Sequence, residues 1–153
     1  MTVAAPERLS PWVVHCDGSA MPNPGRMGVG VVITQPDGTR HTFSQATHTT
    51  GCNNEAELRA LTLALQALRA KGATAVLAYS DNSILVEQLT AADPKPIARL
   101  TPLFDDARAL LGAFDEASVQ WIPRRRNAEA DALARAALGL APKPAPKAWK
   151  KRR

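Results

Sequence analysis

The sequence W-V-V-H-C-D-G-S-A, residues 12–20, contains the first clear strand pattern of the chain. Alternating side chains predict a β-strand over residues 12–17, and this strand is expected to end at Asp17. A carboxylate directly after a buried strand has two interpretations. It caps a turn, or it supplies negative charge to a site at the edge of a sheet. The rest of the chain is needed to decide between them.

Further strand and helix patterns follow along the chain. The runs G-V-G-V-V-I-T-Q (28–35) and T-R-H-T-F-S-Q-A (39–46) flank Asp37-Gly38, which is typical of a β-hairpin. The remaining predicted strands cover residues 75–80 and 118–123, and the predicted helices cover 53–71, 82–89, 97–113 and 127–138. This order predicts an α/β domain with a mixed sheet, an antiparallel meander followed by parallel strands.

Composition places the chain among soluble globular proteins. It has 153 residues, 45% of them hydrophobic and 22% charged, which is the size and composition of one domain. An apolar run of about 18 residues would be needed for a membrane span, and none is present. Without a signal-peptide pattern at the N-terminus, a cytoplasmic location is expected, with Cys16 and Cys52 as free thiols.

The net charge of +5 is concentrated near the C-terminus. We expect a flexible N-terminus over residues 1–10, one domain over residues 11–140, and a disordered basic tail rich in proline and lysine over residues 141–153. Basic arms often contact nucleic acid phosphates, but such a segment can also serve only to increase solubility. The composition of the tail leaves both interpretations open.

Four carboxylates occupy positions that water would not reach in the predicted fold. Asp17 and Asp81 each follow a strand, and Glu57 lies four residues before Leu61 on the apolar stripe of its helix. Asp131 precedes Leu138 by seven residues and so lies on the apolar side of its own helix. Taken singly, each carboxylate could cap a turn or stabilise the N-terminus of a helix through its negative charge. Taken together, they predict a site for a divalent cation, because buried carboxylates repel one another without one.

The type of cation follows from the ligand atoms. Carboxylate oxygens select Mg²⁺ or Mn²⁺ over zinc, and the three histidines do not form a cluster in the sequence. Magnesium held by carboxylates is typical of phosphoryl chemistry, in which two ions activate water and stabilise the leaving oxygen. The residues therefore favour a metal-dependent enzyme acting on phosphate esters.

The chain resembles the type 1 ribonuclease H family over roughly residues 11–140. The similar motifs are D-G-S-A-M-P-N-P-G (17–25), N-N-E-A-E-L (53–58), Y-S-D-N-S (79–83) and N-A-E-A-D-A-L-A (127–134). The resemblance implies a ribonuclease H-like fold, a five-stranded mixed sheet flanked by helices. It also implies endonucleolytic cleavage of the RNA strand of RNA–DNA hybrids, leaving a 3′-hydroxyl and a 5′-phosphate. Asp17, Glu57, Asp81 and Asp131 match the catalytic, metal-binding carboxylates, with two Mg²⁺ ions, or Mn²⁺, expected with substrate.

The resemblance also assigns roles to other residues. Asn23 and Asn54 match asparagines that contact the hybrid, and Gly18 and Ser19 are expected to let the substrate backbone come close. Arg124 places the chain in a subgroup without the catalytic-histidine loop. There, an arginine either holds the scissile phosphate or assists product release, and the other interpretation is a solvated basic loop.

Two further predictions concern the type of protein and its assembly. The alternative to an enzyme is a catalytically weak or inactive module of the same fold that binds hybrids or double-stranded RNA. Retention of all four carboxylates favours the enzyme. A domain of this kind is expected to act as a monomer.

Overall fold

The computed structural model describes residues 10–143 as one sheet with helices on both sides. The five strands follow the order β3-β2-β1-β4-β5 across the sheet. Residues 1–9 and 144–153, where the flexible N-terminus and most of the basic tail are predicted, lie outside the described residues. Among the described residues, no helix is long and apolar enough to cross a membrane.

The sheet is mixed, as the order of elements predicts. The antiparallel meander consists of β1 (Trp12–Met21), β2 (Gly25–Thr34) and β3 (Arg40–Gly51). Two further strands, β4 (Ala75–Ser80) and β5 (Glu116–Trp121), add in parallel beside β1. The predicted fold class is therefore confirmed.

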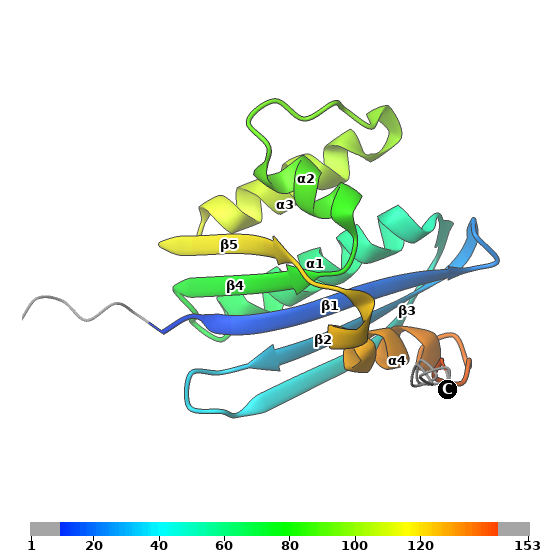
Figure 1. Cartoon of the computed structure of the whole chain (residues 1–153), viewed down its shortest axis with the longest axis horizontal. Helices are drawn as coiled ribbons and strands as arrows, with labels where there is room; N and C mark the ends of the chain where they lie inside the picture. Colours follow the sequence, from blue (N-terminus) through cyan, green and yellow to red (C-terminus); the bar gives the residue numbers. More distant parts are fainter. Residues whose placement is uncertain (1–9, 144–153) are drawn as a thin grey trace, which may run out of the picture.

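Helices cover both faces of this sheet (Figure 1). The helix α1 (Asn53–Ala70) packs on β1 and β2 and against α3 (Thr101–Gly112), whereas α4 (Ala128–Ala136) lies on the opposite face, over β1 and β2. The shorter elements are α2 (Ser83–Thr90), η1 (Ala98–Leu100) and η2 (Arg124–Arg126). The sheet therefore separates α1 from α4, and residues from the two helices can meet only where a strand ends.

The amphipathic stripe predicted for α1 faces the core. Its leucines at positions 58, 61, 65 and 68 are completely buried. On the other face, a Cβ placed at Gly30 would lie 2.2 Å from the carbonyl oxygen of Ala130, so α4 rests directly on the backbone of β2. This close contact fixes the position of α4 relative to β2.

The structure corrects the predicted end of the first strand. The strand β1 continues past Asp17 to Met21, because residues 18–21 pair with the start of β2 and the turn contains only residues 22–24. The parallel pairing of β1 with β4 ends at His15. Asp17 therefore lies inside β1 at the point where β1 extends beyond β4, and this offset opens the sheet beside it.

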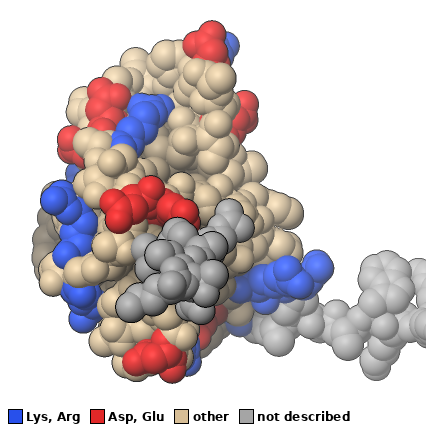
Figure 2. Space-filling model, turned by 90° about the vertical axis from the view of Figure 1, so that its left-hand side faces the viewer, with Lys and Arg blue, Asp and Glu red and all other residues tan. Residues whose placement is uncertain are grey.

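The surface carries both signs of charge. On the face drawn in Figure 2, basic and acidic side chains are interspersed. Six of the 19 lysines and arginines fall within residues 141–153, a segment without Asp or Glu. The basic excess of the chain therefore belongs mainly to this C-terminal segment.

Candidate active site

Three of the predicted carboxylates converge at the open edge beside β1. Asp17, Glu57 and Asp81 each offer an oxygen within 4.8 Å of the others. Asp17 and Glu57 are buried, and Asp81, directly after β4, is half-buried. These three carboxylates are therefore close enough together to form one cluster.

The position of Glu57 depends on how closely α1 approaches β1. A Cβ at Gly18 would lie 2.1 Å from the carbonyl carbon of Ala56 and 2.3 Å from the backbone nitrogen of Glu57. Only glycine leaves room for this contact, which brings Glu57 next to Asp17. Gly18 therefore has a packing role. The approach of substrate at Gly18 and Ser19 stays a prediction.

Asp131 joins the cluster from the opposite face of the sheet. It lies in the first turn of α4, and its side chain is close enough to that of Asp17 to raise the pKa of Asp17. Its Oδ1 also lies 3.7 Å from Nζ of Lys143. The other three predicted carboxylates are therefore neighbours of Asp17, although they come from α1, from the end of β4 and from α4.

Crowding changes the protonation of the two buried members. Burial, followed by the charge of Glu57, raises the pKa of Asp17 far above its usual range. Burial also raises the pKa of Glu57, while hydrogen bonds to Asp17 and Asn82 and the charge of Arg124 oppose this rise. Oε2 of Glu57 is buried and has no hydrogen-bond partner among the described residues. Both carboxyl groups are therefore harder to ionise than an exposed carboxyl group.

These pKa shifts predict how the stability of the metal-free protein depends on pH. Because the folded-state pKa values are raised, the folded protein keeps protons that the unfolded chain releases above about pH 4. Stability should therefore fall as pH rises from 5 to 8 in chelator, and Asp17→Asn should flatten this fall. Thermal denaturation followed by circular dichroism would measure it, with the exposed Asp106→Asn as the control. An equal slope in Asp17→Asn and wild type would contradict the prediction.

The two predicted substrate-binding asparagines, Asn23 and Asn54, each accept a hydrogen bond through the side-chain carbonyl oxygen. Oδ1 of Asn23 accepts a hydrogen bond from the backbone of Asn53 at 3.1 Å, and Oδ1 of Asn54 accepts one from Nδ2 of Asn82 at 2.8 Å. Within residues 10–143, no hydrogen bond occupies Nδ2 of Asn23 or Asn54, so these groups are free to donate. Arg124 is exposed in η2, close enough for its charge to lower the pKa of Glu57.

The N-terminus of α1 is capped by a cysteine and not by an asparagine. Asn53 and Asn54 have the composition of cap residues, but the N-cap is Cys52, whose sulfur accepts a hydrogen bond from the backbone of Glu55 at 3.5 Å. Arg99 donates to the same sulfur at 3.3 Å, and together these contacts lower the pKa of Cys52 despite partial burial. Asn54 is thereby released from capping. Both cysteines are free, as predicted.

One residue of the site was missed by the sequence reasoning. Asn127 was interpreted as the opening residue of the last helix, but Nδ2 donates to Oδ2 of Asp81 and to the carbonyl oxygen of Cys16, both at 2.9 Å. The local sequence N-A-E-A-D gives no sign of these partners, which lie 46 and 111 residues away. Only its position four residues before Asp131 could have drawn attention to it.

The fold and the carboxylate cluster define a protein of the reverse transcriptase-like class, and the family model with that description matches residues 15–137. Ribonuclease HI of Halobacterium salinarum is 35% identical over 136 residues, which cover 89% of this chain and 68% of the relative. The chain belongs to the type 1 ribonuclease H family.

Solved structures and longer relatives agree with this assignment. The crystal structure of ribonuclease H1 from Halobacterium salinarum superposes with a TM-score of 0.79 at 33% identity, covering 85% of this chain and 98% of that one. LC11 ribonuclease H1, solved in complex with an RNA/DNA hybrid, has a TM-score of 0.76 at 29% identity over 84% and 96% of the two chains. A bifunctional protein of Mycobacterium tuberculosis is 33% identical over 84% of this chain, which spans only 36% of that relative.

Proposed function

We propose that the protein is an endonuclease that hydrolyses the RNA strand of RNA–DNA hybrids and leaves a 3′-hydroxyl and a 5′-phosphate. The observation that carries this proposal is the convergence of Asp17, Glu57, Asp81 and Asp131 at one edge of the sheet. A similar ribonuclease H1 forms a complex with an RNA/DNA hybrid, which supports the same substrate class.

The donor set fits Mg²⁺, with Mn²⁺ as a substitute. All four side chains offer carboxylate oxygens, and the unpartnered Oε2 of Glu57 is one that a cation would satisfy. Burial and the neighbouring carboxylates raise the pKa values of Asp17 and Glu57, and a bound cation would offset this rise. When bound, divalent cations of this kind lower the pKa of water and stabilise charge on the phosphate.

The residues of the chain would then hold the substrate and orient it. Nδ2 of Asn23 and Asn54 can donate to 2′-hydroxyls and base edges in the shallow minor groove of the hybrid. Arg124 can hold the scissile phosphate through its guanidinium group, but it cannot exchange protons near neutral pH. Binding of a cation would favour the ionised forms of Asp17 and Glu57, whose pKa values are raised without it.

A cleavage assay with matched duplexes tests this function. Wild-type protein with Mg²⁺ or Mn²⁺ should cut the labelled RNA strand of a hybrid, and excess chelator should stop the reaction. Neither strand of a DNA duplex of the same sequence should be cut, and the DNA strand of the hybrid should stay intact. Tight binding of the hybrid without products would instead support the alternative, an inactive binding module.

A further inference from the structure

Asn127 occupies a helix N-cap position without acting as a cap. It directly precedes α4 and is 1% exposed, yet its side chain makes no capping hydrogen bond. Asparagine at an N-cap normally accepts a hydrogen bond from a backbone N–H of the first turn, and losing that bond destabilises a helix. The side chain of Asn127 therefore makes its contacts elsewhere in the fold.

The carboxamide is oriented by two acceptors on different strands. Its Nδ2 donates to Oδ2 of Asp81, after β4, and to the carbonyl oxygen of Cys16, the residue before Asp17 in β1. Because both partners only accept, Nδ2 must point toward them and Oδ1 must point away. The carboxamide of Asn127 therefore connects β1 to the end of β4, at the point where β1 extends beyond β4.

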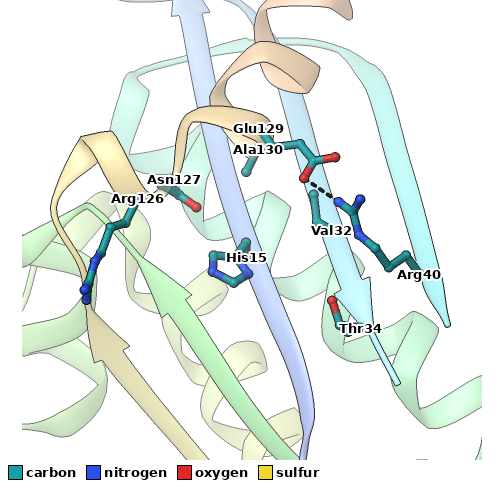
Figure 3. Close-up of a pocket in the computed structure, with 8 residues that line it drawn as sticks. All are labelled: His15, Val32, Thr34, Arg40, Arg126, Asn127, Glu129 and Ala130. Carbon is teal, nitrogen blue, oxygen red and sulfur yellow. Dashed lines mark hydrogen bonds and ion pairs between the residues drawn. The ribbon is translucent and has the colours of Figure 1, made fainter. Parts of the chain in front are cut away.

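The opposite side of Asn127 faces a cavity. Oδ1 is buried without a hydrogen-bond partner among the described residues, and Asn127 lines a cavity of about 240 Å³ together with His15 and Arg126. Figure 3 shows this oxygen directed toward the side of the cavity where His15 lies. Unpartnered buried acceptors are rare in folded proteins, so the orientation of this carboxamide requires an explanation. The bond from Nδ2 to Asp81 provides this explanation.

We propose that Asn127 is a positioning residue that holds the carboxylate of Asp81 in the orientation needed for a cation. The bond to Asn127 fixes the orientation of the Asp81 side chain through Oδ2, while its carboxylate offers an oxygen within 4.8 Å of those of Asp17 and Glu57. A second donor, Nε1 of Trp121, bonds the backbone oxygen of Asp81 at 3.1 Å, so both the main chain and the side chain of Asp81 are held. This inference rests on the proposed function, because it assumes that the cluster binds a divalent cation.

A purely structural role is the competing explanation, since the bond to Cys16 also ties α4 to β1. Two variants separate the roles. Asn127→Ala removes the carboxamide, and Asn127→Leu removes it while keeping the volume and eliminating the unpartnered oxygen. Gln88→Ala is the matched control, because Gln88 is another buried amide whose nitrogen donates to a backbone oxygen, that of Lys95, away from the cluster.

The experiment measures Mn²⁺ binding by calorimetry without substrate, together with the melting temperature, kcat and KM. Both Asn127 variants should bind Mn²⁺ about 10-fold more weakly or worse, as is typical when a residue that orients a metal ligand is lost. Their kcat at fixed Mn²⁺ should fall while KM for the hybrid stays within about twofold. Gln88→Ala should keep the Mn²⁺ affinity of the wild type even if its melting temperature falls.

The outcomes that would overturn the proposal are distinct from those that would overturn the function. Unchanged Mn²⁺ affinity in both Asn127 variants, with a lower melting temperature, would show that Asn127 only stabilises the fold. Absence of Mn²⁺ binding by the wild type would remove the basis of both proposals. If the wild type binds Mn²⁺ and the variants bind it weakly, but no hybrid is cleaved, the positioning role stands and the nuclease function fails.

Discussion

Asp17→Asn is expected to slow cleavage of the RNA strand at least about 1000-fold, a loss of about 4 kcal/mol of transition-state stabilisation. Asp17 is the centre of the cluster, because it offers a carboxylate oxygen within 4.8 Å of those of Glu57 and Asp81, and Asp131 is close enough to raise its pKa. Asparagine has nearly the same shape but offers no anionic oxygen. Single-turnover cleavage of a labelled hybrid at saturating Mg²⁺ would measure the loss.

The same variant should keep its fold. Removing one negative charge from a crowded, metal-free cluster relieves repulsion, so its melting temperature in chelator near pH 8 should equal or exceed that of the wild type. Asp106→Asn, on the exposed face of α3, serves as the control and should retain full activity. A rate for Asp17→Asn within tenfold of the wild type would exclude Asp17 from the chemistry, and a sharply lower melting temperature would indicate a structural role.

Gly18→Ala is expected to have the largest effect on stability. The added methyl group would lie 2.1 to 2.3 Å from backbone atoms of Ala56 and Glu57, which cannot move without displacing α1 from β1. Overpacking of this severity should cost about 3 kcal/mol or more, and the melting temperature should fall by roughly 10 °C. Thermal and urea denaturation would measure the change, and activity should fall too because Glu57 moves with α1.

Gly112→Ala provides the matched control for this substitution. Gly112 ends α3, and a Cβ there would meet no atom within 4 Å. Because alanine favours a helix more than glycine does, this variant should be as stable as the wild type or slightly more so. If Gly18→Ala were equally well tolerated, the close contact between β1 and α1 would not determine the position of Glu57.

Much of the fold and the cluster could be predicted because periodicity is a local property of the sequence. The spacing of Glu57 and Leu61 places both on the buried side of α1, and the patterns around Asp17 and Asp81 place them at neighbouring strands. The length of β1 could not be predicted, because S-A-M-P-N-P-G has the composition of a loop. The small residues in this segment allow β1 to continue beneath α1. This packing involves residues far apart in the sequence, so the local pattern does not reveal it.

Long-range hydrogen bonds account for the other differences. Cys52 caps α1 although sulfur is a weak acceptor, and Asn54 bonds Asn82 instead. Asn127 has the composition of a cap residue, and its contact with Asp81 depends on the meeting of α4 and β4 in three dimensions. Pattern analysis of a single sequence identifies which side chains are buried, but it does not identify their partners.

The offset between β1 and β4 has a consequence for partly folded chains. The four acidic groups come from β1, α1, the end of β4 and α4, so they span most of the polypeptide from residue 17 to residue 131. A nascent or truncated chain without α4 contains three of the groups but not the helix that completes the constellation. Cleavage of the substrate would therefore require the entire folded domain. A chain under synthesis would become active only after α4 has been made.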